Sequence, residues 1–376
     1  MSKICHLSSV HRGLDIRIFR KECLSLAEAG HEIHLVINAS PAEVAEAASL
    51  GVTVHALRYT SNTGRLFRVL VQAFSCYRMG KRLKADLYHL HDPELMLYGL
   101  LLIWSGKRVI FDAHEDLSGS ILARDWIPRF MRNFVAASAR RVERFCARRF
   151  SAVVTATPYI GTLFSDTNDR VLVVNNFPIL GELERQNEFS KVDRDCVCYV
   201  GGIEEIRGIK DSVKAVEIVG CQFLIAGRFG SEKLRDEISQ YAGWRYVKDY
   251  GFVDRDTISK IMEQSFCGLV TLYPVPNYVN ALPIKMFEYM SVGVPVIASN
   301  FPLWRRIIEG NQCGICVDPK KPEEIAAAIQ YLYDRPEEVI RMGQNGRRVS
   351  ERIYRWDKEA SALVSLYRNL LSGEES

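Results

Sequence analysis

Short apolar runs alternate with amphipathic helical segments along almost the whole chain, and this alternation is interrupted once, at 177–195. Before the interruption we expect strands at 4–7, 32–38, 52–57, 87–90, 108–111, 152–155 and 171–174. After it we expect strands at 197–200, 222–226, 244–248, 268–273, 294–299 and 314–317. Strands that alternate with helices form parallel sheets covered on both faces. The sequence therefore predicts an α/β protein with two doubly wound, Rossmann-like parallel-sheet domains.

The length of 376 residues also favours two domains. We place the N-terminal domain at 1–178, a polar linker at 179–195 and the C-terminal domain at 196–355. Doubly wound sheets bind ligands at the carboxyl ends of their strands. We therefore expect the two domains to face each other across a ligand-binding cleft.

Cysteine usage and hydropathy indicate the compartment. Several of the ten cysteines lie in apolar runs such as 196–200, and the first residues lack the pattern of a secretory signal. Buried, reduced thiols are typical of cytosolic proteins. The longest apolar stretch, 95–104, is far shorter than the roughly 20 residues that a membrane-spanning helix needs. We expect a cytoplasmic protein without a spanning helix.

A glycine-rich turn follows the first strand of the C-terminal domain. Gly201 and Gly202 end the apolar run 197–200, and a helix is expected to begin near Gly208. Glycines let the backbone approach a phosphate closely, and a helix N-terminus offers free N–H groups. Arg207 adds a candidate bidentate contact to a diphosphate. An ordinary tight turn with a surface arginine is the alternative interpretation.

A second polar segment, 280–290, enters a helix of the same domain. Pro283 suits the first helical turn, and Ile284 and Lys285 follow it. Glu288 lies about one turn into the helix among apolar neighbours, where a carboxylate must find hydrogen-bond donors. Two ribose hydroxyls would satisfy both of its oxygens. A salt bridge from Glu288 to a nearby lysine or arginine is the alternative.

The segment from Asn280 to Glu288 resembles the donor-binding motif of the family 4 (GT4-type) retaining glycosyltransferases, which have the GT-B fold and include enzymes of bacterial surface-polysaccharide biosynthesis. The resemblance implies that Glu288 binds the ribose of a nucleotide sugar. Asn280 takes the place of the family's first glutamate and, by resemblance, lies beside the transferred sugar as a catalytic residue. It also implies that the C-terminal domain binds the nucleotide sugar and the N-terminal domain binds the acceptor.

The glycine-rich turn is similar to the family's phosphate loop. Gly201, Arg207 and Gly208 match that loop, whereas Gly202 stands where the family usually has an arginine. Lys285, one turn before Glu288, is a substitute phosphate contact. The segment 354–356 is also similar to the family, in which the final helix, here 356–376, crosses back onto the N-terminal domain.

Polar clusters follow three strands of the N-terminal domain. They contain His11 and Arg17, then His91 and Asp92, and then His114 and Glu115, as candidate acceptor-side residues. His114 resembles the family's cleft histidine, whose neutral imidazole accepts or relays a proton near pH 7. His89 and His34 are expected to be hydrogen-bonded core histidines. We find no Asp-X-Asp motif at a strand end and expect neither a metal ion nor a cofactor.

The resemblance implies a hexosyltransferase-type glycosyltransferase (EC 2.4) that moves a sugar from a nucleoside-diphosphate sugar to a saccharide acceptor, lipid-linked in our interpretation, with retention of anomeric configuration. The replacements at Asn280 and Gly202 leave two alternatives open: a catalytically silent nucleotide-sugar-binding protein, and a nucleotide-sugar epimerase on the same fold. A NAD-dependent dehydrogenase is disfavoured because the segment after the first strand, 8–13, contains a single glycine.

Basic residues are concentrated in the N-terminal half. The net charge is +4, but the segment from Arg129 to Arg149 alone carries seven arginines and one glutamate. We expect a helix that docks through a stripe formed by Ile127, Met131, Val135, Ser138 and Val142. Its arginines, with a second basic segment at 65–84, predict peripheral binding to anionic lipid on the inner face of the cell membrane. Nucleic acid is not an expected partner, because no base-reading motif accompanies the arginines.

Overall fold

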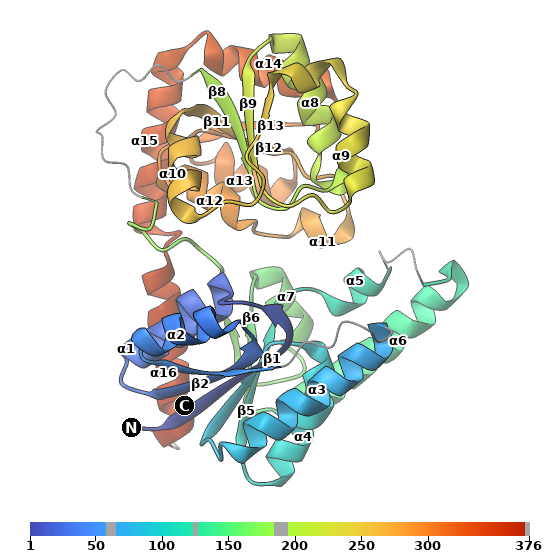
Figure 1. Cartoon of the computed structure of the whole chain (residues 1–376), viewed down its shortest axis with the longest axis vertical. Helices are drawn as coiled ribbons and strands as arrows, with labels where there is room; N and C mark the ends of the chain where they lie inside the picture. Colours follow the sequence, from blue (N-terminus) through green and yellow to red (C-terminus); the bar gives the residue numbers. More distant parts are fainter. Residues whose placement is uncertain (58–64, 123–126, 184–194, 373–376) are drawn as a thin grey trace. The chain divides into compact units, whose positions relative to one another are not determined.

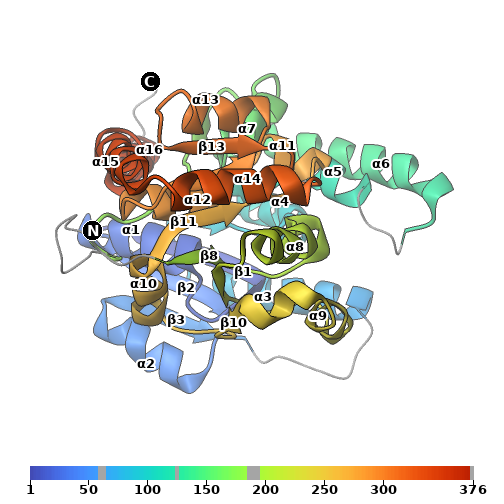
Figure 2. The ribbon, with the colours of Figure 1, turned by 90° about the horizontal axis from the view of Figure 1, so that it is seen from above.

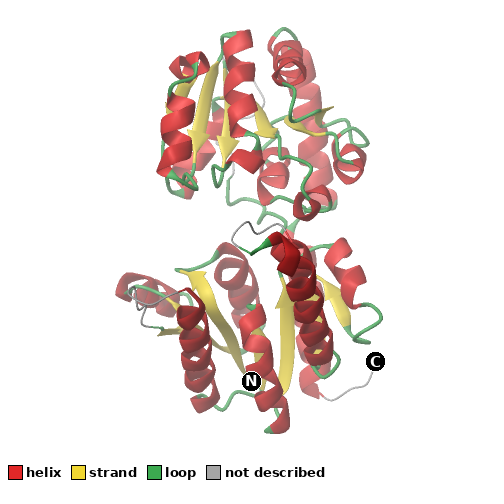
Figure 3. Ribbon diagram, turned by 90° about the vertical axis from the view of Figure 1, so that its right-hand side faces the viewer, coloured by secondary structure: helices red, strands yellow, loops and turns green. Residues whose placement is uncertain are grey.

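The computed structural model describes residues 1–57, 65–122, 127–183 and 195–372, with only the backbone described at 65–70. The chain divides into two compact units, which are described separately. Unit 1 comprises Met1–Asn176 and Asp357–Ser376, and unit 2 comprises Phe177–Trp356. Each unit contains a parallel sheet with helices on both faces (Figures 1 and 3). The predicted α/β class with two doubly wound sheets is confirmed.

The sheet of unit 1 has, within the described residues, seven parallel strands in the order β3-β2-β1-β4-β5-β6-β7. The strands are β1 (Lys3–Arg12), β2 (Glu32–Asn38), β3 (Val52–Ala56), β4 (Leu87–Leu90), β5 (Arg108–Ala113), β6 (Ala152–Thr155) and β7 (Val171–Val173). The helical elements are η1 (Ile16–Cys23), α1 (Leu24–Glu28), α2 (Pro41–Ser49), α3 (Arg65–Arg82), η2 (Pro93–Leu95), α4 (Met96–Trp104), α5 (Leu117–Leu122), α6 (Arg129–Ala147), α7 (Pro158–Phe164) and α16 (Trp356–Ser372).

Two local features near the start of unit 1 differ from the prediction and position the site. Strand β1 runs to Arg12, with a register shift between Leu7 and Arg12, so His11, which was expected after the strand, lies within it. The next helix begins where expected, because the Asp15 carboxylate accepts hydrogen bonds from the N–H groups of Arg17 and Ile18. This helix, η1, is π-helical, and it buries Arg17 and Glu22 beneath the strand ends.

The sheet of unit 2 has, in the part of the chain described, six parallel strands in the order β10-β9-β8-β11-β12-β13. They are β8 (Cys196–Val200), β9 (Gln222–Ala226), β10 (Val247–Asp249), β11 (Ser265–Val270), β12 (Val296–Ser299) and β13 (Gly314–Val317). The helices are η3 (Glu205–Arg207), α8 (Ile209–Val219), α9 (Glu232–Ser239), η4 (Ala242–Tyr246), α10 (Arg255–Glu263), α11 (Pro276–Val279), α12 (Ile284–Ser291), α13 (Pro302–Ile308), α14 (Pro322–Tyr333) and α15 (Pro336–Arg352). Figure 2 shows the same elements from above.

The segment predicted as a linker begins inside unit 2. Phe177 and Leu183 are buried in the core of that unit, and the N–H of Trp356 donates to the Pro178 carbonyl. The rest of the predicted linker, 184–194, lies outside the described residues. At the other end, α16 returns to unit 1, where Leu363 and Tyr367 are fully buried.

The basic helix α6 forms as predicted, but its packing face differs. Met131 and Val142, expected in the docked stripe, are 42% and 45% exposed. The buried positions are instead Ala136, Glu143, Cys146 and Ala147. In Figures 1 and 2 the first half of α6 extends away from the sheet of its own unit. The expected stripe is therefore wrong at these two positions, and the helix leaves apolar side chains at the surface.

The hydropathy of the helices and the state of the cysteines can also be compared with the predictions. Among the described residues, every helix is too short or too polar to cross a membrane. The ten cysteines all lie in the described part of the chain as thiols without disulfide bonds, and all but Cys316 are buried. Burial raises the pKa of these thiols, for example that of Cys146 to about 11, as expected for inert core cysteines.

Candidate active site

The carboxyl ends of β1, β4 and β5 gather polar side chains at one edge of the sheet of unit 1. These side chains line a cavity of about 520 Å³ within the unit. The predicted residues that meet there are His11, His91, Asp92, His114 and Glu115, together with the unpredicted Glu94, Asp112 and Glu143. The sequence therefore identified five of the eight polar or charged side chains that line the cavity and missed three carboxyl groups.

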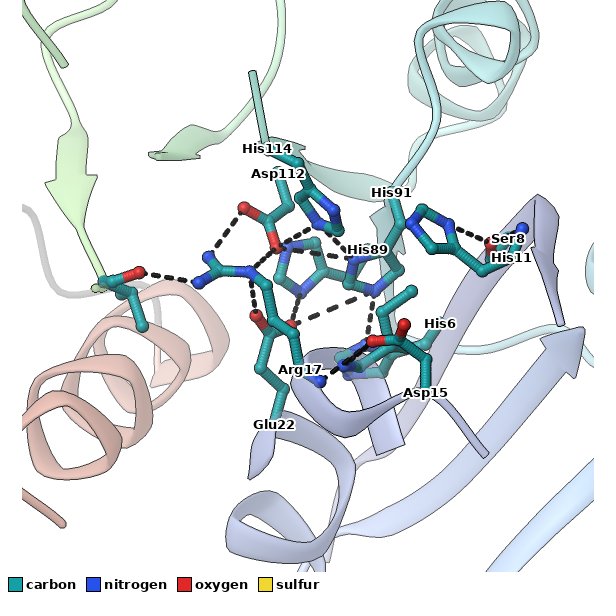
Figure 4. Close-up of polar contacts among 12 residues, drawn as sticks. His6, Ser8, His11, Asp15, Arg17, Glu22, His89, His91, Asp112 and His114 are labelled. Atoms are coloured by element: carbon teal, nitrogen blue, oxygen red, sulfur yellow. Dashed lines mark hydrogen bonds and ion pairs between the residues drawn. The ribbon is translucent and has the colours of Figure 1, made fainter. Parts of the chain in front are cut away.

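Asp112, at the end of β5, is the centre of this arrangement (Figure 4). Its two carboxylate oxygens accept hydrogen bonds from Nη2 and Nε of Arg17, at 2.9 and 3.1 Å. Its Oδ2 also lies 2.9 Å from Nε2 of His114 and 3.4 Å from Nδ1 of His91. Burial alone would raise the pKa of Asp112, but the Arg17 guanidinium and the His114 contact bring it well below its usual range. Asp112 is therefore ionised.

Arg17 does not face an acceptor, contrary to the prediction. It is 5% exposed, and its Nη1 donates to the Val174 carbonyl at 2.8 Å while the rest of the fork binds Asp112. Its Nε also lies 3.1 Å from Oε1 of Glu22, which is fully buried. Burial and the neighbouring Asp112 raise the pKa of Glu22 well above its usual range. Arg17 thus organises two buried carboxyl groups beneath the cavity.

His11 and Asp92 form a second pair on the cavity wall. His11 Nδ1 lies 3.0 Å from Asp92 Oδ1, and Asp92 Oδ2 accepts hydrogen bonds from the N–H of Ser9 and the hydroxyl of Ser8 at 2.6 and 3.0 Å. Burial alone would lower the pKa of His11, but the Asp92 hydrogen bond and charge raise it. Glu115 instead accepts a hydrogen bond from Ser120 at 2.7 Å.

Behind the cavity lies a group of buried histidines, His6, His89 and His91, whose rings contact one another. His6 Nδ1 is 2.9 Å from His91 Nε2, and His89 Nδ1 is 2.5 Å from the hydroxyl of Tyr367. His89 was predicted to be a hydrogen-bonded core residue, and this contact agrees. Two sets of side chains place potential metal-ligand atoms within 4.8 Å of one another: His6, Glu22, His89 and His91, and His91, Asp112 and His114.

In unit 2 the glycine-rich turn lies against Lys285, which is buried, and Arg207, which is half-buried. Gly201 has φ +113°, and a Cβ there would lie 3.4 Å from the Lys285 Cε. A Cβ on Gly202 would lie 3.4 Å from the Arg207 Nη1, so the small residue leaves room for the guanidinium. The Lys285 Nζ and the Arg207 Nε are buried without a hydrogen-bond partner among the described residues. The Arg207 Nε also lies 3.4 Å from Oε2 of Glu204, so Lys285 is the less satisfied of the two. A buried, unsatisfied amino group beside an arginine at a glycine turn is an arrangement that fits an anion.

The helix α8 begins directly after this turn. Gly208, its N-cap, has φ +77°, and a Cβ there would lie 2.0 Å from the Thr271 carbonyl oxygen, so only glycine fits. Lys285 lies over the face of Tyr199, with Nζ 3.3 Å from the ring centroid. Burial, and then the charge of Arg207, lowers the pKa of Lys285 well below its usual range. An arriving anion would reverse that effect.

Glu288 is buried and forms a salt bridge with Arg255. A salt bridge was the alternative to ribose binding that the sequence left open. Its Oε1 accepts a hydrogen bond from the Arg255 Nη1 at 2.8 Å, and the Arg255 Nη2 binds Glu182 at 2.9 Å. The side chain of Arg255 is 27% exposed. Glu288 is therefore held in place by a partly accessible arginine rather than by a core residue.

The remaining predicted donor residues surround the entry of α12. Pro283 is its N-cap and Ile284 its first residue, as expected from the proline. Asn280 ends the short helix α11, and both Asn280 and Pro283 are half-buried. The loop between them is fixed by a 2.7 Å hydrogen bond from the Trp304 Nε1 to the Ala281 carbonyl.

Comparisons with known proteins agree with this architecture. The family model described as Glycosyltransferase Family 4 matches residues 19–177, and the one described as Glycosyl transferases group 1 matches residues 182–349. An alpha-D-kanosaminyltransferase from Streptomyces kanamyceticus is 28% identical over 196 residues, or 50% of this chain and 49% of that protein. The chain thus spans about half the length of the curated relatives it matches.

Solved structures show the same fold over the whole chain. Sucrose-phosphate synthase from Thermosynechococcus elongatus superposes with a TM-score of 0.78 at 17% identity, covering 100% of both chains. HepE from Anabaena in complex with UDP superposes with a TM-score of 0.72 at 14% identity, covering 98% of this chain and 100% of that one. Two doubly wound parallel-sheet units of this kind define the GT-B class. Because the two family models account for 19–177 and 182–349, the chain belongs to the family 4 glycosyltransferases.

Proposed function

We propose that the protein transfers a sugar from a nucleoside-diphosphate sugar to a hydroxyl group of a saccharide. The bond between the sugar C1 and the diphosphate oxygen breaks, a bond from C1 to the acceptor oxygen forms, and the hydroxyl proton neutralises the released diphosphate. The observation that carries this proposal is the buried amino group of Lys285, which has no hydrogen-bond partner among the described residues and lies with Arg207 at the glycine turn of unit 2. A diphosphate would supply the acceptor that Lys285 lacks and a further acceptor for Arg207.

The donor-side residues can be assigned to successive parts of the nucleotide sugar: the diphosphate, the ribose and the transferred sugar. The glycine turn and the N-terminus of α8 would receive the diphosphate, with Lys285 and Arg207 beside it. Glu288 would bind the ribose with the oxygen that Arg255 leaves free, or after Arg255 moves. Asn280 would contact the transferred sugar through its amide. The complex of the Anabaena HepE with UDP, a protein of the same fold, supports this class of ligand.

We propose that these cations balance the diphosphate charge without a divalent ion, so transfer should persist in a chelator. Retention of anomeric configuration is carried over from the family resemblance. NMR of the product should show the anomeric configuration of the donor, and an inverted product would overturn that part of the proposal.

His114 is proposed as the acceptor-side catalytic residue. It lines the cavity of unit 1, and its side chain is 21% exposed, whereas Asp112 behind it is buried. An imidazole with one nitrogen held by a carboxylate can present the other to a substrate hydroxyl. His11, Asp92 and Glu115 line the same cavity and would contact the acceptor saccharide.

The first test is a panel of nucleotide sugars in a thermal-shift assay, because a ligand that binds the folded state raises the melting temperature. The matching donor should then be hydrolysed slowly, releasing a nucleoside diphosphate. A protein that binds a nucleotide sugar but releases no nucleoside diphosphate, with any acceptor, would be the silent binding protein. Conversion of the sugar without an acceptor would identify an epimerase.

We further propose that helix α6 binds an anionic membrane surface, where a lipid-linked acceptor would be found. Three phenylalanines of this helix are strongly exposed: Phe130 at 85%, Phe134 at 72% and Phe145 at 50%. The Arg149 guanidinium lies 3.7 Å from the centroid of the Phe145 ring. Arginines beside exposed aromatic rings are typical of helices that lie in the headgroup region. Trp126, a further candidate for insertion, lies outside the described residues.

Sedimentation with anionic vesicles tests the membrane proposal. Each basic residue near an anionic leaflet contributes about 1 kcal/mol, so binding should occur at low salt and weaken at high salt. Replacing Arg140, Arg144 and Arg148 with glutamate should abolish it, and replacing Phe130 and Phe134 with serine should weaken it at every salt concentration. A protein that stays in the supernatant with vesicles at low salt would refute the proposal.

A further inference from the structure

A continuous series of polar contacts links the cavity of unit 1 to the C-terminal helix α16 (Figure 4 shows its histidines and acids). His114 and His91 both contact Oδ2 of Asp112, at 2.9 and 3.4 Å. His91 Nε2 lies 2.9 Å from His6 Nδ1, and His6 Nε2 lies 3.4 Å from the Tyr367 hydroxyl. The same hydroxyl lies 2.5 Å from His89 Nδ1. The series joins β1, β4, β5 and α16.

The directions of the hydrogen bonds in this series can be assigned step by step, starting from one ionised group. Asp112 is held as a carboxylate by the Arg17 fork, so it only accepts hydrogen bonds. Nε2 of His114 and Nδ1 of His91 must therefore both carry protons. The 3.4 Å contact between these two nitrogens then joins two N–H groups that share one carboxylate oxygen.

The remaining protons are assigned one after another. His91 and His6 are fully buried, and burial lowers the pKa of both imidazoles, so each is neutral and carries one proton. With its proton on Nδ1, His91 accepts at Nε2 from Nδ1 of His6. His6 then accepts at Nε2, where the hydrogen-bond partner among the described residues is the Tyr367 hydroxyl, 3.4 Å away.

Tyr367 has a single proton, so it must accept from Nδ1 of His89. This direction leaves His89 Nε2 as a bare acceptor, and that atom is indeed buried without a partner among the described residues. If the Tyr367 hydroxyl donated to His89 Nδ1 instead, His89 Nε2 would carry a buried, unpaired N–H. His6 Nε2 would then have no donor. Unpaired buried acceptors are tolerated better than unpaired buried donors.

We propose that Asp112 is a positioning residue that fixes His114 in the tautomer with a free Nδ1, and that His91, His6, Tyr367 and His89 form one directional hydrogen-bond chain that ends on the same carboxylate. The role of His114 toward an acceptor rests on the proposed function, but the chain itself does not. In this tautomer the free Nδ1 of His114 accepts a hydrogen bond from the attacking hydroxyl. The C-terminal helix thereby joins the hydrogen-bond network of the carboxylate that positions His114.

The direct test is the tautomeric state of the histidines, measured by two-bond ¹H–¹⁵N correlation spectra of the ¹⁵N-histidine-labelled protein without substrate. We expect His114 to be protonated at Nε2 alone, and His91 and His6 at Nδ1 alone. His34 on β2 and His55 on β3 provide an internal reference outside this hydrogen-bond chain, with His34 Nδ1 3.0 Å from His55 Nε2. A His114 protonated at Nδ1, or a His6 protonated at Nε2, would overturn the assignment whether or not the protein transfers sugar.

Two variants test the coupling. Tyr367→Phe removes the donor to His6, so the signals of His6 and His91 should shift to mixed tautomers while those of His34 and His55 stay unchanged. Tyr88→Phe is the matched control, because Tyr88 is equally buried in unit 1 but binds Ala85 and Gly80 instead. Unchanged His6 signals in Tyr367→Phe, or equal shifts in the control, would contradict the chain.

Asp112→Asn tests the positioning role. It should allow the other tautomer of His114 and lower the rate of transfer at saturating donor by roughly 10²- to 10⁴-fold, with the donor affinity unchanged. The rival explanation of the buried cluster is a metal ion held by His6, Glu22, His89 and His91. One equivalent of metal in the purified protein would refute the chain, because the bare nitrogens that accept its hydrogen bonds would bind the ion instead.

Discussion

Replacing Lys285 should have opposite effects on the stability of the ligand-free protein and on ligand binding. Its ammonium is buried beside the glycine turn without a hydrogen-bond partner, over the ring of Tyr199 and near Arg207. A buried polar group left unsatisfied costs about 1–3 kcal/mol, and more when it is charged. Lys285→Met keeps the length of the side chain and removes that cost. We therefore expect the ligand-free variant to be more stable than the wild type by about 1–3 kcal/mol.

The same substitution should weaken nucleoside diphosphate binding. A hydrogen bond to a charged group contributes about 1.5–3 kcal/mol, which corresponds to about a 10- to 150-fold increase in Kd. Burial lowers the pKa of Lys285 in the ligand-free protein, and a bound diphosphate would raise it again. At a pH between the lowered pKa of the ligand-free protein and the ordinary lysine pKa of about 10.4, binding should therefore take up protons.

Isothermal titration calorimetry in buffers of different ionisation enthalpy measures both the affinity and the proton uptake. Lys214→Met is the control, because Lys214 belongs to the same unit and its side chain is 50% exposed.

The lowered pKa of Lys285 also makes the stability of the protein depend on pH. Between the lowered pKa of the folded state and the ordinary pKa of the unfolded chain, the unfolded state binds the extra proton, so stability rises with pH and Lys285→Met removes that rise.

If Lys285→Met binds nucleoside diphosphate as tightly as the wild type, with unchanged proton uptake, then the anion does not bind at Lys285. The assignment of the glycine turn as the diphosphate site would then be wrong. A variant that is less stable without ligand would show instead that the ammonium has a structural partner.

Three further substitutions have distinct signatures. Glu288→Ala should weaken binding of nucleoside and nucleoside diphosphate alike, because both carry the ribose, and unchanged affinity for either in calorimetry would contradict the assignment. Arg207→Ala should weaken nucleoside diphosphate binding much more than nucleoside binding, so equal losses would remove Arg207 from the phosphates. Burial and the nearby Asp116 raise the pKa of Glu143 to about 7; the folded state then holds the proton more tightly, and stability should fall by about 3 kcal/mol as the pH rises from about 4 to about 7. Chemical denaturation of Glu143→Gln should show no such fall, and a fall of the same size in that variant would assign it to another group.

The local alternation of strands and helices was predictable because it depends on the period of apolar residues along short segments. The class, the number of sheets and most strand positions follow from it. The strand expected at 244–248 is wrong in part, since η4 occupies Ala242–Tyr246 and β10 begins at Val247. Gly243 explains the difference: a Cβ there would lie 2.3 Å from the Val213 carbonyl oxygen, so the chain packs tightly on α8 instead of extending.

The cavity residues at strand ends were predictable because topology alone brings them to one edge of the sheet. Their partners were not, because pairing depends on packing between segments far apart in sequence. Arg17 and Asp112 are separated by 95 positions, and His89 and Tyr367 by 278. Glu143 lies on α6, whose predicted packing stripe included Met131 and Val142, and these two side chains are exposed in the structure. Asp112, two positions before His114, and Glu94, two positions after Asp92, are the missed residues that their places in the strand-end clusters could have revealed.

The return of α16 to unit 1 has a consequence for how the protein is made. Unit 2 is one continuous stretch, whereas unit 1 is complete only when the helix that carries Tyr367 has left the ribosome. At roughly 5–20 residues per second, synthesis from Asn176 to Asp357 takes about 10–40 s. During that interval His6 and His89 of the nascent chain lack the hydroxyl group that joins them. A chain released early, without its last helix, would thus expose an unfinished polar core, which chaperones and proteases can recognise before the protein ever meets a substrate.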